Sequence, residues 1–169
     1  SQNMRPPAIE KMGYYPTDEP VIEAIQSYIA PAANRARMFD PCAGEGLAAS
    51  LLGKELNCET WGVELSPERA AKAEQVLDKV YQAPWQACFL TDESISCLFL
   101  NPPYEYDRFD DHPAENSGAS KRLELEFLKT TTSKLARGGL LIYIIPQRIL
   151  GMPEVARLVV GHYENIRIF

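Results

Sequence analysis

Apolar residues with helical spacing alternate with short strand-like runs along the first half of the chain. The pattern predicts helices at 19–30, 47–56 and 66–80, and strands at 37–40 and 60–64. Strands that alternate with helices in this way are typical of an α/β fold. We therefore expect a mostly parallel sheet with helices on both faces.

The second half of the chain continues this alternation. It contains strand candidates at 85–90, 97–100, 140–145 and 163–169. Helix candidates run from about Leu123 to the pair Gly138-Gly139, and over 153–161. Residues 105–120 are acidic and rich in turn formers, which predicts a surface loop. Because the chain ends inside its last predicted strand, we expect a C-terminally truncated fragment of a longer protein.

Length and composition predict one globular domain. The chain has 169 residues, of which 46% are hydrophobic and 24% are charged, enough for a single core. Residues 1–12 are an N-terminal extension that starts with an apparent tag remnant, and residues 13–169 form the expected domain. Lys and Arg number 17 against 23 Asp and Glu, a net charge of −6, which disfavours binding a polyanion by overall charge alone.

The chain lacks the sequence features of membrane, secreted and metal-binding proteins. No apolar run approaches the roughly 20 residues that span a bilayer, and no signal-peptide pattern is present. The four cysteines contain no Cys-x-x-Cys pair, and the two histidines are far apart in sequence. We therefore predict a cytoplasmic protein with free thiols, no metal site and no membrane partner.

The segment Asp40-Pro41-Cys42-Ala43-Gly44-Glu45-Gly46 connects a predicted strand to a predicted helix. Open parallel sheets bind ligands at such positions, and Gly44 and Gly46 allow close approach of the backbone; a tight turn kept for packing is the alternative. Glu64 ends the next strand, where a carboxylate can accept hydrogen bonds from both ribose hydroxyls. The loop lacks the Gly-x-Gly-x-x-Gly pattern, so an adenosine ligand without pyrophosphate fits better than NAD or FAD.

These residues resemble the first two motifs of the class I S-adenosylmethionine-dependent methyltransferases. The resemblance implies a Rossmann-like methyltransferase sandwich with S-adenosyl-L-methionine as the cofactor. Residues of the first motif would surround the methionine part of the cofactor, and Glu64 would hold its ribose. Members of this class have a seventh, antiparallel strand, which this chain is expected to lack.

The segment Asn101-Pro102-Pro103-Tyr104 follows the predicted strand at 97–100. It resembles the Asn-Pro-Pro-Tyr motif of amino methyltransferases, most often those specific for adenine in DNA. A conjugated amine is a poor nucleophile, so the Asn101 side-chain oxygen and the Pro102 carbonyl would accept its hydrogens in the transition state. Tyr104 offers a face for stacking of a flipped base. A proline turn beside a surface tyrosine is the alternative.

The segment Gly13-Tyr14-Tyr15-Pro16-Thr17 precedes the first predicted helix. It resembles the part of adenine methyltransferases that folds over the methionine end of the cofactor. Core contacts and a helix cap are the alternative for these residues. The segment is also similar to a poorly characterised family of methyltransferase-like proteins from mobile elements and prokaryotic genomes. Together the resemblances assign the following residues to the cofactor: Tyr15, Pro16, Thr17, Asp40, Pro41, Cys42, Ala43, Gly44, Gly46, Glu64, Leu65, Cys88, Phe89 and Asn101.

One position departs from the family pattern. Members commonly place an acid at the end of the strand expected near 85–90, to meet the adenine amine of the cofactor, whereas this chain has Cys88-Phe89-Leu90. Backbone groups or the nearby Asp92 would then recognise the adenine.

We predict an enzyme that methylates the exocyclic amine of adenine in DNA, with a recognition domain or partner outside this chain. Basic residues could form a local rim beside the site or a simple solvated surface: Arg5, Lys11, Arg108, Lys121 and Arg122. Base amines in RNA and glutamine amides in proteins are alternative substrates. A catalytically silent domain that binds the cofactor or a partner chain is a further alternative.

Overall fold

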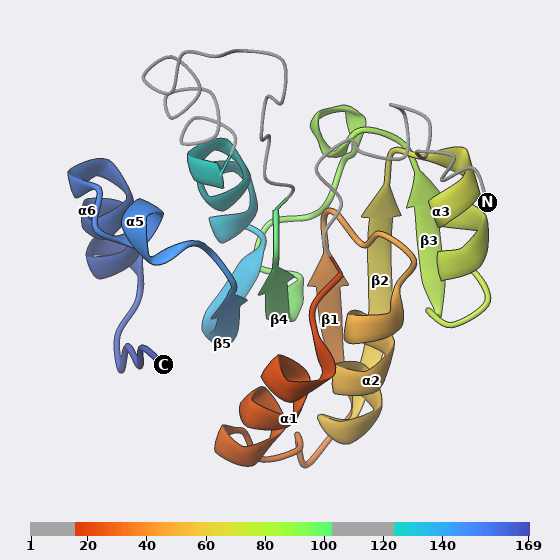
Figure 1. Cartoon of the computed structure of the whole chain (residues 1–169), viewed down its shortest axis with the longest axis horizontal. Coiled ribbons are helices and arrows are strands. Elements are labelled where there is room, and N and C mark those ends of the chain that lie inside the picture. Colours follow the sequence, from red (N-terminus) through yellow and green to blue (C-terminus); the bar gives the residue numbers. More distant parts are fainter. Residues whose placement is uncertain (1–15, 103–123) are drawn as a thin grey trace, which may run out of the picture.

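The computed structural model describes residues 16–102 and 124–169. Within them, five parallel strands form one sheet in the order β3-β2-β1-β4-β5 (Figure 1). The strands are β1 (Ala36–Asp40), β2 (Cys58–Glu64), β3 (Lys79–Gln82), β4 (Ile95–Leu100) and β5 (Leu135–Tyr143). The predicted parallel α/β fold is confirmed.

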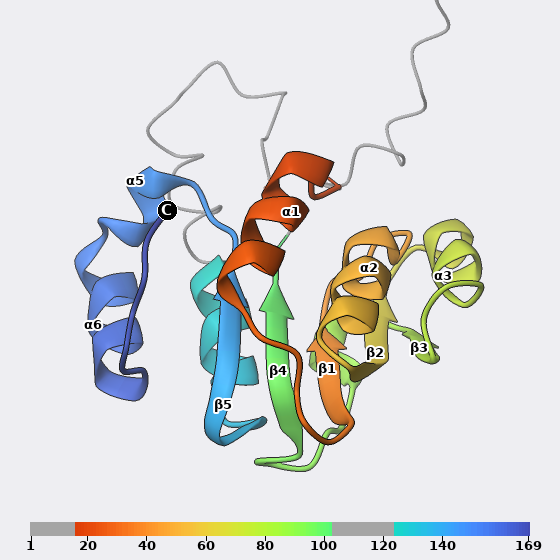
Figure 2. The ribbon, with the colours of Figure 1, turned by 90° about the horizontal axis from the view of Figure 1, so that it is seen from below.

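Helices flank this sheet, and Figure 2 shows α5 and α6 beyond β5, with α3 at the β3 end. The helices are α1 (Glu19–Tyr28), α2 (Leu47–Glu55), α3 (Pro67–Ala73), a helix over residues 124–132, α5 (Gln147–Leu150) and α6 (Pro153–His162). None of the described helices is long and apolar enough to cross a bilayer.

The sheet separates two hydrophobic cores, and β4 contributes to both because successive side chains point to opposite faces. Phe99 packs with Ile22 of α1 and Leu52 of α2. Leu98 packs on the other face with Leu128 of helix 124–132 and with Val155 of α6. Helices therefore cover both faces of the sheet, as the alternating pattern predicts.

The third helix begins as predicted but is shorter. The Ser66 hydroxyl accepts a hydrogen bond from the Arg69 N–H over 3.4 Å. The helix ends at Ala73 instead of Val80. Residues 74–78 form a turn that leads into β3, which begins at Lys79. Asp78 fixes that start: its carboxylate accepts from the Thr60 N–H over 2.8 Å, and its own N–H donates to the Thr60 hydroxyl over 3.0 Å.

The predicted strand at 85–90 is wrong. Trp85–Ala87 form a short 3-10 helix, η2. Its Trp85 ring is buried against Phe39, with ring centroids 5.3 Å apart. The Trp85 indole N–H donates to the Thr130 hydroxyl over 2.8 Å, and this hydrogen bond holds the ring in the core.

The glycine pair lies inside a strand and does not end a helix. The helix before it stops at residue 132, and β5 runs through Gly138 and Gly139. The pairing with β4 shifts register here: Ile95 lies opposite Leu135, whereas Cys97 lies opposite Leu140. The glycines thus occupy a bulge, which explains why they look like a stop signal in sequence.

The last predicted strand is also wrong. Residues 163–169 follow α6 without regular secondary structure. Their end lies beside α1, where the Phe169 and Tyr28 rings stack with centroids 4.0 Å apart.

Candidate active site

The carboxyl ends of three neighbouring strands bring the predicted polar residues together. Asp40 is the last residue of β1, Glu64 is the last residue of β2, and Asn101 directly follows β4. Because β1 lies between β2 and β4, these residues stand at one edge of the sheet, around the point where the strand order reverses. Ligands bind at such reversal points in open parallel sheets.

The buried carboxylate of Glu64 organises the loop after β1. Its Oε1 atom accepts a hydrogen bond from the Gly44 N–H over 3.0 Å, and Oε2 accepts one from the Ser66 N–H over 2.8 Å. Arg69 also contacts Oε2, over 3.3 Å from Nε and 3.2 Å from a terminal guanidinium nitrogen. Both oxygens therefore have partners within the chain, and a further donor must share them or displace Arg69.

Asp40 is buried beside this loop. Its Oδ1 atom accepts a hydrogen bond from the Cys42 N–H over 3.0 Å. Burial raises the pKa of Asp40 to about 7; the hydrogen bond from Cys42 opposes this rise, and the negative charge of Glu64 adds to it. Near neutral pH the acid is therefore present in both protonation states, and a cationic ligand group would favour the ionised one.

Asn101 joins three segments that are distant in sequence. The Asn101 side-chain nitrogen donates to the Thr17 hydroxyl over 2.9 Å, and the Cys42 thiol donates to the Asn101 carbonyl over 3.2 Å. Burial raises the pKa of the Cys42 thiol well above its ordinary value, so the sulfur keeps the proton that it donates. Because Nδ2 is directed to Thr17, the acceptor atom Oδ1 lies on the other branch of the amide.

Residues 7–169 match an uncharacterised methyltransferase family, DUF6094. The chain belongs to this methyltransferase family. The match confirms the methyltransferase class that the glycine loop and Glu64 predict, whereas the Asn-Pro-Pro-Tyr subgroup stays a prediction. No curated protein matches the chain.

Solved structures of methyltransferases share the fold. An S-adenosylmethionine-dependent O-methyltransferase from Thermotoga maritima is 14% identical, with a TM-score of 0.59 over 90% of this chain and 54% of its own. A geranyl diphosphate methyltransferase in complex with S-adenosylmethionine is 13% identical, with a TM-score of 0.56 over 85% of this chain and 63% of its own. The chain spans less than two thirds of the length of either structure. The shared fold confirms the predicted Rossmann-like methyltransferase fold.

Glycines shape the loop of this DUF6094 methyltransferase in two ways. Gly44 and Gly46 adopt left-handed conformations, with φ of 59° and 81°. A side chain at Gly46 would lie 3.2 Å from the Ala73 Cα atom, so Gly46 also permits the close packing of α3. Pro41 is buried beneath the loop, and the Ala43 N–H donates to the Val63 carbonyl over 2.8 Å.

Gly62 is a site residue that the sequence interpretation missed. A Cβ atom there would lie 2.9 Å from the Ala43 Cβ atom and 2.8 Å from Leu77 Cδ1. The glycine therefore lets the loop after β1 lie directly against β2. A glycine in the middle of a strand is the signal that could have revealed this role.

The remaining described candidates lie at different places. Cys88 follows η2 instead of ending a strand, and its thiol donates to the Pro84 carbonyl over 3.5 Å. Leu65 directly follows Glu64 at the carboxyl end of β2 and is half exposed, and Phe89 is fully exposed. Asp92 precedes β4, at the opposite edge of the sheet, and pairs with the Lys134 ammonium over 2.7 Å.

Other predicted residues lie outside the described part of the chain. They are Tyr15, Pro103, Tyr104, the loop at 105–120 and the basic residues Arg5, Lys11, Arg108, Lys121 and Arg122. Pro16 is described and exposed, and Pro102 is buried. Within residues 16–102 and 124–169, no group of three His, Cys, Asp or Glu side chains could hold a metal ion.

Proposed function

We propose that this domain is an S-adenosylmethionine-dependent N-methyltransferase acting on the exocyclic amine of adenine in DNA. The observation that carries the proposal is the junction at Asn101. Its side chain is held by Thr17 and its carbonyl by Cys42, so the predicted catalytic segment lies against the predicted cofactor loop.

The described residues fit the polar parts of the proposed cofactor. Asp40 offers a buried carboxyl for an ammonium group, and Glu64 offers one for ribose hydroxyls at the end of the neighbouring strand. When bound, S-adenosylmethionine would supply an electrophilic methyl group. The other cofactor residues proposed here are Tyr15, Pro16, Thr17, Pro41, Cys42, Ala43, Gly44, Gly46, Leu65, Cys88, Phe89 and Asn101.

Two acceptors from the chain would activate the amine. The Asn101 Oδ1 atom and the Pro102 carbonyl would each accept one amine hydrogen as the nitrogen becomes pyramidal. The hydrogen bond to Thr17 holds the Asn101 amide in one orientation, and Pro102 is buried, so both acceptors are preorganised. Pro103 and Tyr104 complete the proposed catalytic segment.

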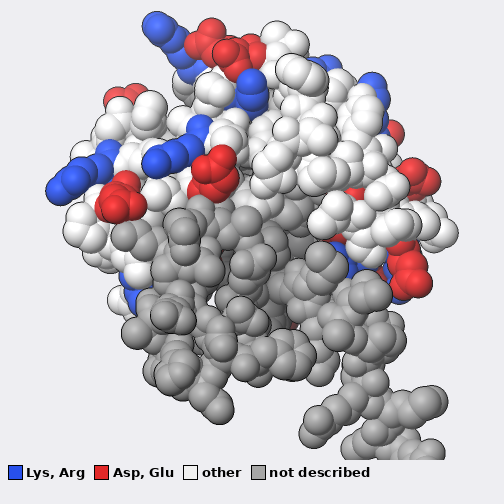
Figure 3. All heavy atoms as spheres, turned by 90° about the horizontal axis from the view of Figure 1, so that it is seen from above, with Lys and Arg blue, Asp and Glu red and all other residues white. Residues whose placement is uncertain are grey.

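Charge supports a recognition element outside this chain. Figure 3 looks onto the edge to which the strands point, and its described residues show acidic and basic side chains next to one another. The net charge of −6 also does not attract DNA strongly. We infer that a separate recognition domain or partner, in the cytoplasm, delivers the DNA.

Methyl transfer to candidate macromolecules tests this function. The chain is incubated with methyl-labelled S-adenosylmethionine and with DNA, RNA or protein, and the label is then challenged with DNase, RNase and protease. Sensitivity to DNase, with loss of labelling in Asn101→Ala, supports the proposal. The matched control is Asn34→Ala, an exposed residue before β1.

Label that only RNase or protease removes would overturn the DNA assignment and favour an RNA amine or a glutamine amide. Cofactor binding without transfer to any macromolecule, also in a longer chain, would favour a catalytically silent domain.

A further inference from the structure

A buried carboxyl group lies in the first described turn of helix 124–132. Glu124 is fully buried, and neither of its carboxyl oxygens has a hydrogen-bond partner in the described part of the chain. Native proteins pair nearly all of their buried polar groups, so each exception needs an explanation. The site described above does not use this residue.

Helical geometry directs Glu124 toward the sheet. Residues at i, i+4 and i+7 lie on one face of a helix, and here they are Glu124, Leu128 and Thr131. Leu128 and Thr131 are fully buried, and Leu128 packs with Leu98 and Leu100 of β4. Glu124 therefore continues the sheet-facing side of the helix at the start of its described part.

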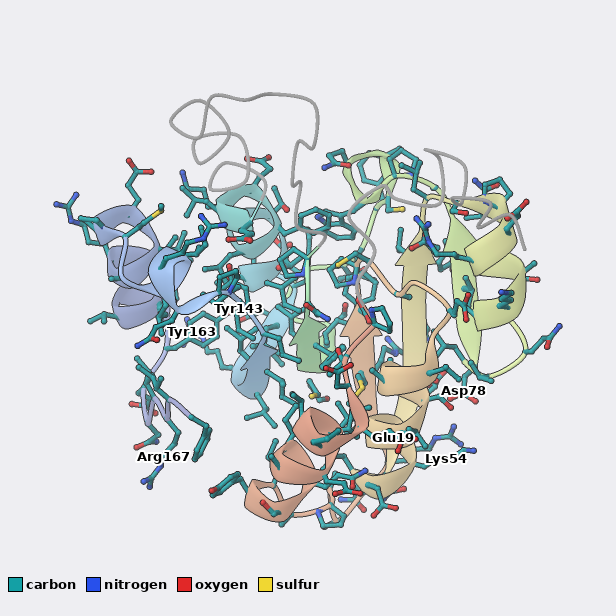
Figure 4. The ribbon with its side chains drawn as sticks, viewed as in Figure 1. Glu19, Lys54, Asp78, Tyr143, Tyr163 and Arg167 are labelled. Carbon is teal, nitrogen blue, oxygen red and sulfur yellow. The ribbon has the colours of Figure 1, made fainter. Side chains whose placement is uncertain are left out.

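Tyr143 places this end of the helix at the same edge as Asn101. The Tyr143 hydroxyl donates to the Glu124 backbone carbonyl over 3.4 Å, and Figure 4 shows Tyr143 near the connection from β5 to α5. Tyr143 lies opposite Leu100 in the sheet, and the Ile144 N–H donates to the Leu100 carbonyl over 2.9 Å. Asn101 is the next residue after Leu100, so the backbone of Glu124 lies beside β5, the strand next to the one that leads into the proposed catalytic segment.

The environment of Glu124 favours the neutral acid. Burial raises its pKa to about 7, and the positive charge of Arg148 on α5 opposes this rise only in part. A neutral carboxyl group can donate a hydrogen bond as well as accept one. What it lacks is a partner.

We propose that Glu124 is a specificity-determining residue that donates a hydrogen bond to the ring nitrogen beside the amine held by Asn101. In adenine this acceptor is N1, bonded to the carbon that carries the exocyclic amine. Asn101 and Pro102 would then bind the amine hydrogens, while Glu124 reads the neighbouring ring atom. This inference rests on the function proposed above.

Substitution of Glu124 separates this role from a structural one. Glu124→Leu removes the hydrogen bond, and we expect at least about a tenfold loss in kcat/KM for adenine in DNA. The same variant should melt at a temperature no lower than wild type, because it also removes a buried carboxyl group without a partner. Glu124→Gln keeps a donor and should recover most of the activity. The matched control is the exposed Glu126→Leu on the same helix.

A substrate analogue tests the contact itself. Oligonucleotides with adenine or 1-deazaadenine at the target are bound to the chain at low salt, which favours weak DNA binding, in the presence of S-adenosylhomocysteine, so that turnover is not needed. Wild type should bind the analogue at least about tenfold more weakly, whereas Glu124→Leu should bind both equally. Equal discrimination by both proteins would overturn the inference. Failure of wild type to bind S-adenosylhomocysteine would instead overturn the proposed function.

Discussion

The side-chain nitrogen of Asn101 donates a hydrogen bond to the Thr17 hydroxyl over 2.9 Å, although the two residues lie 84 positions apart. This bond connects the segment before α1 to the residue that follows β4. It fixes which branch of the Asn101 amide is the acceptor, and the proposed chemistry requires that choice. Thr17 is therefore a positioning residue in this account, in addition to its predicted place beside the cofactor.

Removal of the Thr17 hydroxyl should reduce catalysis without unfolding the domain. Thr17→Val keeps the shape of the side chain but loses the acceptor, and we expect about a tenfold lower kcat because the Asn101 amide can then rotate. Thr17→Ser should restore kcat. Measurement of kcat together with the melting temperature checks this. An unchanged kcat in Thr17→Val would show that the contact does not position Asn101.

Asp40 should make the stability of the domain depend on pH. Its pKa is raised from 3.8 to about 7 in the folded state, so the folded chain holds a proton that the unfolded chain releases. The resulting stabilisation is fully present below pH 4 and is lost as the pH rises to about 7. Relative to Asp40→Asn, wild type should lose about 1.4 kcal/mol per pH unit in this window.

Urea unfolding of wild type and Asp40→Asn from pH 4.5 to 8 measures this difference. Glu124 titrates in the same range, but it is present in both proteins and cancels. Parallel curves would contradict the buried, proton-binding role of Asp40.

Glu64 should stabilise both the fold and the bound cofactor. Glu64→Ala removes the acceptor for Gly44 and Ser66 and leaves Arg69 without its buried partner, so we expect a loss of about 1–3 kcal/mol in the free energy of unfolding. Affinity for S-adenosylmethionine should fall by a similar amount. Chemical denaturation and calorimetric titration check the two effects. Lys72→Ala breaks an exposed ion pair with Glu45 and should change either quantity by less than about 0.5 kcal/mol.

A methyl group at Gly62 should disturb the glycine loop. Gly62→Ala would place a Cβ atom 2.9 Å from the Ala43 Cβ atom, and such overpacking costs about 1–3 kcal/mol of stability. Cofactor affinity should fall because the loop must shift. The contrasting control is Gly161→Ala in α6, where a Cβ atom meets nothing within 4 Å and should stabilise the helix. Wild-type stability and affinity in Gly62→Ala would contradict this packing role.

The sequence predicted the strands that carry the site better than the rest of the sheet. β1, β2 and β4 are buried toward their carboxyl ends, and each leads into a residue with distinctive chemistry. β3 was missed because its residues are mostly exposed and show no apolar alternation. The aromatic and apolar residues at 85–90 favour a strand by local preference. The burial of Trp85 against Phe39 is instead a tertiary contact, made from a short 3-10 helix.

The sequence predicts which residue types form the site and their order along the chain. It does not predict the contacts between them. Asp40, Glu64 and Asn101 are predictable because each ends or directly follows a strand of a parallel sheet. The partners of Glu64 were not, because Arg69 and Gly44 reach it only after folding. Glu124 carries no local signal, since its burial depends on the packing of helix 124–132 against β4.

Calorimetric titration of the folded chain with S-adenosylmethionine and S-adenosylhomocysteine tests the central claim most directly. We expect dissociation constants in the micromolar range for both ligands, weakened in Glu64→Ala and in Asp40→Ala and unchanged in Lys72→Ala. Circular dichroism of the same samples establishes that each protein is folded. Absence of binding to folded wild type, or equal affinity in all four proteins, would contradict a cofactor site formed by Asp40 and Glu64.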